Sequence, residues 1–314
     1  MRTLFFAPLF AALFWLAPSA WALDCPAEPI APNAEKIAEL QAKASDHGML
    51  WRITRQGRSS YLYGTLHLGR LEWLFPGPKM LKAWAQTEVL ALEIDTSDPV
   101  KISTELASSA GPSAPLKPAQ LARLITAAKA ACVPDAVMQS LVSQPPLMQV
   151  SMLSALSARR DGLELGYGQE WLLTGMAQNS HRPIVGLETV QEQMQVFVSG
   201  SAAEAETMVN EGLDELGDEQ SRAAMLKLTN AWADSQLEVL ADYENWCNCA
   251  KTPAAREWLR RLNDGRNPTI AERIAALHAK GKPVFVAVGA LHMTGPKSLP
   301  KLLADKGFKV ERVY

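Results

Sequence analysis

Two copies of one short signature are the residues of this chain best suited to chemistry: Gly64-Thr65-Leu66-His67 and Gly289-Ala290-Leu291-His292. Each copy closes an apolar run typical of a β-strand, so each histidine is expected just beyond a strand end. In an open α/β sheet, ligands bind beyond the carboxyl ends of the strands, where residues distant in sequence can meet. The glycine permits a tight turn or a close backbone approach there. We therefore expect His67 and His292 to share one polar crevice.

Two carboxylates occupy similar positions. Glu93 interrupts an apolar run that begins at Val89, and Glu188 follows the run Ile184-Val185-Gly186-Leu187. A buried carboxylate is costly unless it is paired with a cation, hydrogen-bonded or bound to a metal. A purely structural role remains the alternative to chemistry for both residues. For Glu93 it is an ion pair with an arginine such as Arg266 or Arg273, and for Glu188 it is stabilisation by the N-terminus of the following helix.

Two imidazoles and two carboxylates suit a divalent ion such as zinc, manganese, iron or cobalt. An ion with an open coordination position acidifies a bound water for hydrolysis, and one of the glutamates then takes the proton. The chain lacks a Gly-x-Ser-x-Gly elbow, a Gly-rich phosphate loop, a dinucleotide fingerprint and a His-Glu-x-x-His helix, which disfavours other enzyme classes. The residues predicted both as catalytic groups and as metal ligands are therefore His67, Glu93, Glu188 and His292.

The elements that must position these residues alternate between strands and helices. The patterns predict a hairpin with strands at 51–55 and 60–66, and further strands at 89–94, 183–188, 283–288 and 308–313. They predict helices at 78–87, 267–280 and 296–306, and helical stretches over about 100–180 and 200–262. Thr189 and Glu192 form a capping box, and Asn267 before Pro268 is expected to be a helix N-cap. The expected fold is α/β, with a central, mostly parallel sheet, helices on both faces and two strand-bearing halves that bracket helical insertions.

The first 22 residues have the features of a secretory signal peptide. Arg2 precedes an apolar stretch over 4–16, and an Ala-x-Ala cleavage site ends at Ala22. The apolar stretch is shorter than the roughly 20 residues that span a membrane, so membrane contact is expected only before cleavage. Residues 23–44 are then an N-terminal lead-in and residues 45–314 a single domain, periplasmic or secreted. Cleavage leaves 30 basic against 33 acidic groups, a net charge of −3 with no basic stripe for nucleic acid.

The four cysteines indicate disulfide bonds, because an even number in an exported chain usually forms them. A direct link between Cys247 and Cys249 closes a very small ring and is disfavoured. The expectation is therefore that Cys25 and Cys132 are joined to Cys247 and Cys249, one to each. A zinc site built from cysteines is the alternative, which the single intervening residue and the oxidising compartment make less favourable.

Several segments, in the same order and spacing, resemble the TraB/GumN family over roughly residues 45–314. They are Tyr63-Gly64-Thr65-Leu66-His67-Leu68-Gly69, Ala91-Leu92-Glu93-Ile94-Asp95, Val185-Gly186-Leu187-Glu188-Thr189, Arg266-Asn267 and Phe285-Val286-Ala287-Val288-Gly289-Ala290-Leu291-His292. The chain differs from relatives at Gly265, where an acidic residue is frequent, and at Met293, where leucine is common. The first difference puts a contact that supports the site in doubt.

The resemblance implies an α/β domain related to the Tiki metalloproteases, and more distantly to erythromycin esterase-like and haem-binding ChaN-like proteins. It implies that His67, Glu93, Glu188 and His292 form the active site, with Arg266 and Asn267 as supporting, cofactor-binding groups. The leading hypothesis is thus a metal-dependent hydrolase of the bacterial envelope that acts on a peptide or protein. A non-enzymatic haem- or metal-binding protein using the same crevice is the alternative, and a structural role in envelope assembly is a third. Family membership does not fix the substrate.

Overall fold

The computed structural model describes residues 25–27, 29–109, 114–198 and 201–314, so the predicted signal peptide lies outside the described residues. These residues form a six-stranded sheet in the order β4-β3-β5-β2-β1-β6. The strands are β1 (Met49–Arg55), β2 (Arg58–Thr65), β3 (Val89–Leu92), β4 (Ile184–Gly186), β5 (Val284–Gly289) and β6 (Lys309–Arg312). The predicted α/β class with a mostly parallel sheet is confirmed.

Four neighbouring strands, β4, β3, β5 and β2, run parallel. At one side of them β1 pairs antiparallel with β2, and β6 pairs antiparallel with β1, so β1 is the one strand of the described sheet that runs in the opposite direction. β3 is buried throughout, as expected for a strand that is covered on both sheet faces. The predicted hairpin of β1 and β2 turns at Gln56 and Gly57, whose φ angles of 52° and 75° match the turn that follows the twist of a hairpin. The carboxyl ends of the four parallel strands therefore share one edge of the sheet.

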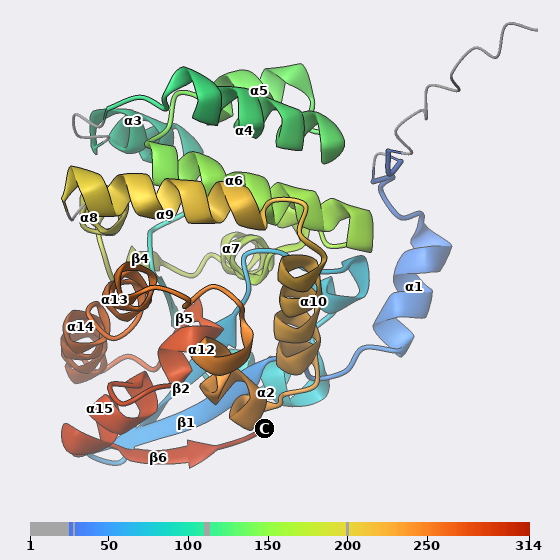
Figure 1. Ribbon diagram of the computed structural model, residues 1–314. Coiled ribbons are helices and arrows are strands. Elements are labelled where there is room, and N and C mark those ends of the chain that lie inside the picture. The colour runs from blue at the N-terminus through green and yellow to red at the C-terminus, as the bar shows by residue number, and fades with distance from the viewer. Residues whose placement is uncertain (1–24, 28, 110–113, 199–200) are drawn as a thin grey trace, which may run out of the picture.

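Helices cover the sheet and form a further layer. They are α1 (Ala34–Ala42), α2 (Pro78–Ala85), α3 (Pro99–Ser109), α4 (Pro118–Ala130), α5 (Asp135–Leu141), α6 (Pro146–Ser157), α7 (Gln169–Asn179), α8 (Val190–Val198), α9 (Ala202–Glu215), α10 (Glu219–Ala233), α11 (Leu237–Ala241), α12 (Tyr243–Trp246), α13 (Pro253–Leu262), α14 (Asn267–Ala279) and α15 (Leu299–Asp305). Figure 1 shows α4, α5, α6 and α9 stacked together on the side away from β1 and β6. No helix in the described part of the chain has the length and hydropathy needed to cross a membrane.

The apolar interior has two parts that follow this division. One cluster contains the buried side chains of the sheet, such as Leu90 and Phe285, together with Ile270 of α14. The other joins α4, α6 and α9 through side chains such as Leu124 and Leu153. The helical insertions predicted from the sequence thus have an apolar cluster of their own beside the sheet.

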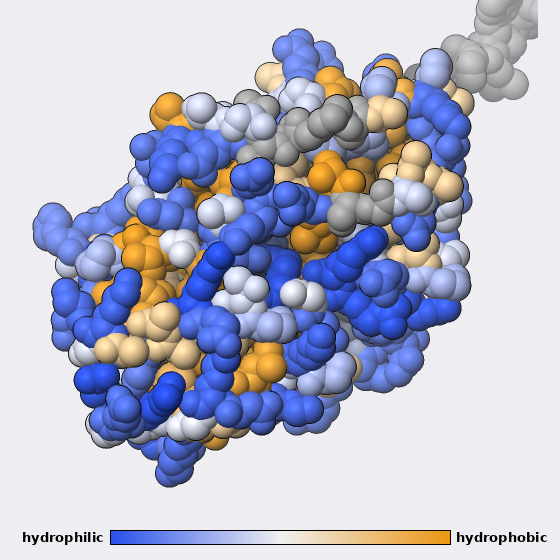
Figure 2. Space-filling model, turned by 90° about the vertical axis from the view of Figure 1, so that its left-hand side faces the viewer, coloured by the Kyte–Doolittle hydropathy of each residue, from blue (hydrophilic) through white to orange (hydrophobic). Residues whose placement is uncertain are grey.

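The surface carries paired charges, as the near-neutral net charge suggests. Figure 2 shows a largely hydrophilic face with smaller hydrophobic patches between the polar groups. Exposed ion pairs include Arg273 with Glu192 at 2.7 Å, and Lys306 with Glu272. Such exposed pairs contribute little to stability individually, so the stability of the fold depends on the two apolar clusters.

The disulfide pairing expected from the sequence is wrong. The bonds join Cys25 to Cys132 and Cys247 to Cys249, with Cα–Cα distances of 5.6 and 5.1 Å. The small ring closes because Asn248 adopts a left-handed backbone with φ of 61°, which asparagine tolerates better than most residues. Cys132 directly follows the C-cap of α4, so the first bond attaches the N-terminal segment to the helical layer.

Replacing Cys25 and Cys132 together with serine is expected to lower the free energy of unfolding by about 2–4 kcal/mol, because a cross-link over a long loop strongly restricts the unfolded chain. This bond spans 107 residues, whereas the other spans two. The matched control is the Cys247→Ser, Cys249→Ser double variant, for which a clearly smaller loss is expected. Urea unfolding of both variants measures the difference, and equal losses would contradict the expectation.

Candidate active site

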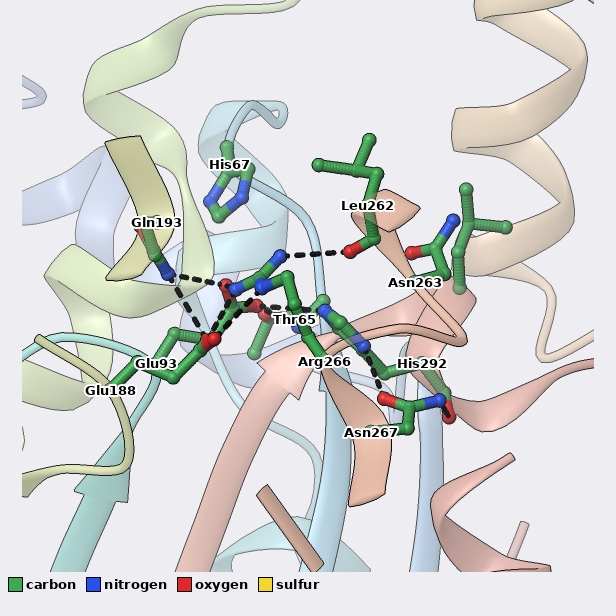
Figure 3. A network of polar contacts seen from close by, with 12 residues as sticks. Thr65, His67, Glu93, Glu188, Gln193, Leu262, Asn263, Arg266, Asn267 and His292 are labelled. Atoms are coloured by element: carbon green, nitrogen blue, oxygen red, sulfur yellow. Dashed lines mark hydrogen bonds and ion pairs between the residues drawn. The ribbon is translucent and has the colours of Figure 1, made fainter. Parts of the chain in front are cut away.

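The polar residues identified in the sequence lie at the carboxyl edge of the parallel strands. His67 comes just after β2, Glu93 after β3 and Glu188 after β4, while His292 lies in the 3₁₀ turn Ala290–Met293 that follows β5. Figure 3 shows Glu93, Glu188 and His292 in one group with Arg266 and Asn267, and His67 above it. The parallel strands thus bring together residues that are far apart in the chain.

Arg266 holds the two carboxylates together. Its Nε donates a hydrogen bond to Glu188 Oε1 at 2.9 Å, and its Nη2 donates to Glu188 Oε2 at 2.5 Å and to Glu93 Oε2 at 2.6 Å. The side chains of Glu93 and Glu188 are only 11% and 4% exposed. The guanidinium therefore offsets the cost of burying both charges. Of the two arginines considered from the sequence, Arg266 is the partner, whereas Arg273 pairs with Glu192.

Further contacts keep Glu93 ionised. Burial acts to raise its pKa, but the charges of Arg266 and the two histidines and a backbone hydrogen bond together hold the pKa of Glu93 well below its ordinary value. The backbone bond comes from Gly289 N–H, which donates to Oε1 at 2.7 Å. A Cβ on Gly289 would lie 3.2 Å from the same oxygen, so glycine at this position of the second signature allows the close approach. Gln193 of α8 also donates to Glu93 Oε2, at 2.9 Å.

Asn267 determines which nitrogen of His292 carries the proton. The Asn267 Nδ2 donates to the Lys297 carbonyl at 2.9 Å and to the His292 carbonyl at 3.3 Å, so its Oδ1 must face the imidazole. This Oδ1 accepts from His292 Nδ1 at 2.5 Å. Nε2 of the neutral ring therefore has a free lone pair, and it lies 3.7 Å from Glu93 Oε1.

The buried position of His292 favours the neutral ring. The His292 residue is only 3% exposed. Burial lowers its pKa to about 4, although the charge of Glu93 acts in the opposite direction. At neutral pH the group is therefore an unprotonated imidazole beside an ionised carboxylate. This is the protonation state that a general base requires.

The prediction that Asn267 caps α14 is wrong. Arg266 occupies the N-cap position without a side-chain cap bond, and Asn267 is the first residue of the helix. The Asn267 residue is fully buried, and its amide is occupied by its three contacts with Lys297 and His292, so it does not bond the free N–H groups of the helix. Asparagine is a common N-cap residue, so the residue type alone predicted a cap where Asn267 instead contacts the site.

His67 has a carboxylate partner that the sequence did not reveal. Thr65 Oγ1 donates to Glu170 Oε1 at 2.5 Å, and His67 Nδ1 lies 3.2 Å from the same oxygen. The charge of Glu170 raises the pKa of His67 above its ordinary value, although 69% of the His67 side chain is exposed to solvent. Glu170 lies in the first turn of α7, where carboxylates are common because of the helix dipole. Its sequence position therefore carried no distinctive signal.

Replacing Glu170 with glutamine is expected to lower the pKa of His67 toward about 6.5, because the neutral amide no longer favours the imidazolium. The titration of the His67 ring protons by nuclear magnetic resonance measures this change. Glu192→Gln is the control, since Glu192 binds the exposed Arg273 and should leave the titration of His67 unchanged. A His67 titration that is identical in wild type and Glu170→Gln would contradict the assignment.

The residues as they are arranged do not fit a divalent metal ion. Arg266 occupies the position between the two carboxylates, and His67 contacts Glu170 instead of joining them. Within the ranges that the structure describes, no group of three or more His, Cys, Asp or Glu side chains is placed to hold a metal. Binding a metal would require the guanidinium to leave both carboxylates. The metal expected from the sequence stays a prediction.

Comparison with known proteins identifies the family of this chain but indicates no activity. The model of the TraB/PrgY/gumN family matches residues 49–312. The chain is similar to the uncharacterized protein YbaP of Shigella flexneri, with 26% identity over 266 residues that cover 80% of this chain and 90% of that protein. It is also similar to the uncharacterized protein YbaP of Escherichia coli (strain K12), with 25% identity over the same coverage. No solved structure matches the chain.

Proposed function

The chain belongs to the TraB/PrgY/gumN family, and from this premise we propose that it is a hydrolase of the bacterial envelope with peptides as substrates. The observation that carries the proposal is the His292 imidazole, whose free Nε2 faces the ionised Glu93 at 3.7 Å. The carboxyl edge of parallel strands is the usual position of a ligand in an open α/β sheet. The choice of peptides rests on the resemblance to the Tiki proteases.

The facing atoms of His292 and Glu93 are suited to hold a water molecule. Both are acceptors, so a water that lies beside the pair and bridges the two atoms donates one hydrogen bond to each. When this water attacks a carbonyl carbon, Nε2 takes its proton, and the Glu93 carboxylate stabilises the imidazolium that forms. Arg266 keeps Glu93 in place and ionised through the 2.6 Å contact.

His67 is suited to the second proton transfer. Glu170 favours its protonated form, whereas burial favours the neutral form of His292. Environments that push two pKa values apart in this way typically separate an acid from a base. In the proposed reaction, the C–N bond of the tetrahedral intermediate breaks while His67 gives its proton to the leaving amine. The products are an amine and a carboxylic acid, which ionises to the carboxylate. The His292 imidazolium then releases its proton to solvent, and His67 takes up a proton again.

The proposed compartment is the periplasm or the medium. The two disulfide bonds support it, because such bonds persist in oxidising compartments. The signal peptide expected at the N-terminus supports it as well. A peptide substrate would reach the site in either compartment after export of the protein.

Cleavage of a broad peptide library in ¹⁸O-enriched water tests the proposal. The tag-free protein is expected to produce new C-termini that contain one ¹⁸O atom, because water supplies the new carboxylate oxygen. A parallel preparation of Glu93→Gln, which lacks the stabilising charge, should lose this cleavage, and Glu192→Gln should keep it. The absence of cleavage by the wild-type protein, or equal cleavage by Glu93→Gln, would overturn the proposal.

The exposed His67 ring favours a second candidate, a carrier of haem. An exposed imidazole nitrogen is a common axial ligand of haem iron. Titration of the protein with haem distinguishes the two functions. A Soret band that disappears in His67→Ala, together with no cleavage of the peptide library, would favour the carrier.

A further inference from the structure

We propose that the Cys247–Cys249 disulfide is a thiol–disulfide exchange site that oxidises a dithiol on another polypeptide. This activity is independent of the proposed hydrolysis. It involves a bond between two residues that are separated by one asparagine, on the segment between α12 and α13.

The fold does not need the Cys247–Cys249 bond as a cross-link. It spans two residues, whereas the Cys25–Cys132 bond spans 107, and a short loop gains little from closure. Other contacts already hold the segment. The Cys247 N–H donates to the Tyr243 carbonyl at 2.9 Å, and Arg256 Nη1 donates to the Ala250 carbonyl at 2.8 Å.

The two cysteines of the bond differ in burial. Cys247 is 4% exposed, whereas Cys249 is partly exposed, so Cys249 is the more accessible residue of the pair for an incoming thiolate. The backbone N–H of Cys249 donates to Cys247 Sγ at 3.1 Å. A hydrogen bond of this kind stabilises the thiolate, which makes Cys247 the better leaving group.

The surface beside Asn248 is hollowed. A hollow of about 360 Å³ is lined by Asn248, Trp246 and Lys227 among others, and Lys227 is the charged residue in this lining. The Lys227 Nζ lies 4.4 Å from the centre of the Trp246 ring. The hollow reaches Asn248, between the two cysteines, and gives space for a polypeptide segment, and the ammonium group of its lining favours an approaching thiolate.

The exchange is balanced without a further reactant. A thiolate of the partner attacks Cys249 Sγ, a mixed disulfide forms, and the electron pair of the broken S–S bond passes to Cys247 Sγ. The second thiolate of the partner then attacks its own sulfur in the mixed disulfide and releases the Cys249 thiolate. The partner dithiol becomes a disulfide, and the two thiolates of this chain take up the two protons.

Two measurements on the full-length mature protein test the proposal. In graded dithiothreitol followed by alkylation and peptide mass spectrometry, Cys247 and Cys249 should become reduced at a concentration about tenfold lower than Cys25 and Cys132. In the second measurement, a reduced peptide with two cysteines should be oxidised in a one-to-one ratio by the wild-type protein. The Cys247→Ser, Cys249→Ser variant should not oxidise it.

Each measurement has an outcome that overturns the proposal. One is reduction of Cys247 and Cys249 no earlier than Cys25 and Cys132. The other is equal oxidation of the peptide by the wild type and the double serine variant. Urea unfolding of the variant shows that it is folded in the second measurement, and the first measurement needs no variant.

Discussion

Replacing Arg266 with methionine is expected to lower the free energy of unfolding by about 3–5 kcal/mol at neutral pH, because it leaves two buried carboxylates without their cation. The methylene groups of the side chain are largely retained, so the change mainly removes the charge and its hydrogen bonds. These bonds run from Nε and Nη2 to Glu188 and Glu93 at 2.5–2.9 Å. Chemical denaturation of the variant and the wild type at pH 7 measures the loss.

A nearby arginine provides the control for this substitution. Arg260 of α13 pairs with Glu257, and both side chains are at least half exposed. The Arg260→Met variant should therefore lose less than about 1 kcal/mol. A comparably small loss in Arg266→Met would show that the two buried carboxylates do not depend on the guanidinium.

The pH dependence gives a second check on Arg266. The pKa of Glu93 is depressed in the folded protein, so its contribution to stability is present above its ordinary value of 4.5 and is lost as the pH falls below that value. In Arg266→Met, burial without the cation raises the pKa of Glu93 instead. The stability of this variant should therefore increase between pH 7 and pH 5, and an unchanged or opposite slope would contradict the explanation.

Replacing His292 with asparagine is expected to lower the rate of peptide hydrolysis by about 10²- to 10⁴-fold, the usual contribution of a general base. Asparagine retains a polar side chain but has no group that takes a proton from water near neutral pH. Initial rates on the best substrate of the peptide library measure the effect. His181→Asn is the control, because His181 is exposed, lies before β4 at the opposite end of that strand, and has a φ of 52° that asparagine tolerates.

The assignment of His292 as the general base also predicts how the rate of peptide hydrolysis changes at acidic pH. Burial lowers the pKa of His292 to about 4, so the ring remains an unprotonated base through mildly acidic pH. The rate should therefore hold as the pH falls from 7 to 5 and decrease as it approaches 4. A rate that instead falls with a midpoint near 6.5 would indicate an ordinary exposed histidine.

Much of the framework was predictable from local patterns. The apolar runs before Glu93 and after Pro283 identify buried strands, and the Gln56-Gly57 turn identifies the hairpin. Because the carboxyl ends of parallel strands lie at one edge of the sheet, these patterns also predicted that His67 and His292 lie at that edge. The sequence also named Arg266 as one of two candidate partners of Glu93.

The features that local sequence patterns did not predict depend on contacts between residues far apart in the chain. Glu170 reaches His67 through the docking of α7, in which Gln169 N–H donates to the Leu66 carbonyl at 3.0 Å. The bridge from Arg266 to Glu188 joins positions 78 residues apart. The disulfide pairing was mispredicted because residue spacing carries no information on the left-handed backbone of Asn248, which lies inside the small ring.

The rate of peptide hydrolysis before and after chelation tests whether His292 and Glu93 activate water while Arg266 occupies the space between the carboxylates. Tag-free protein dialysed against a chelator should retain its hydrolysis rate within about twofold, because a base supplied by a side chain needs no bound ion. A loss of activity that added zinc or manganese restores would contradict the account.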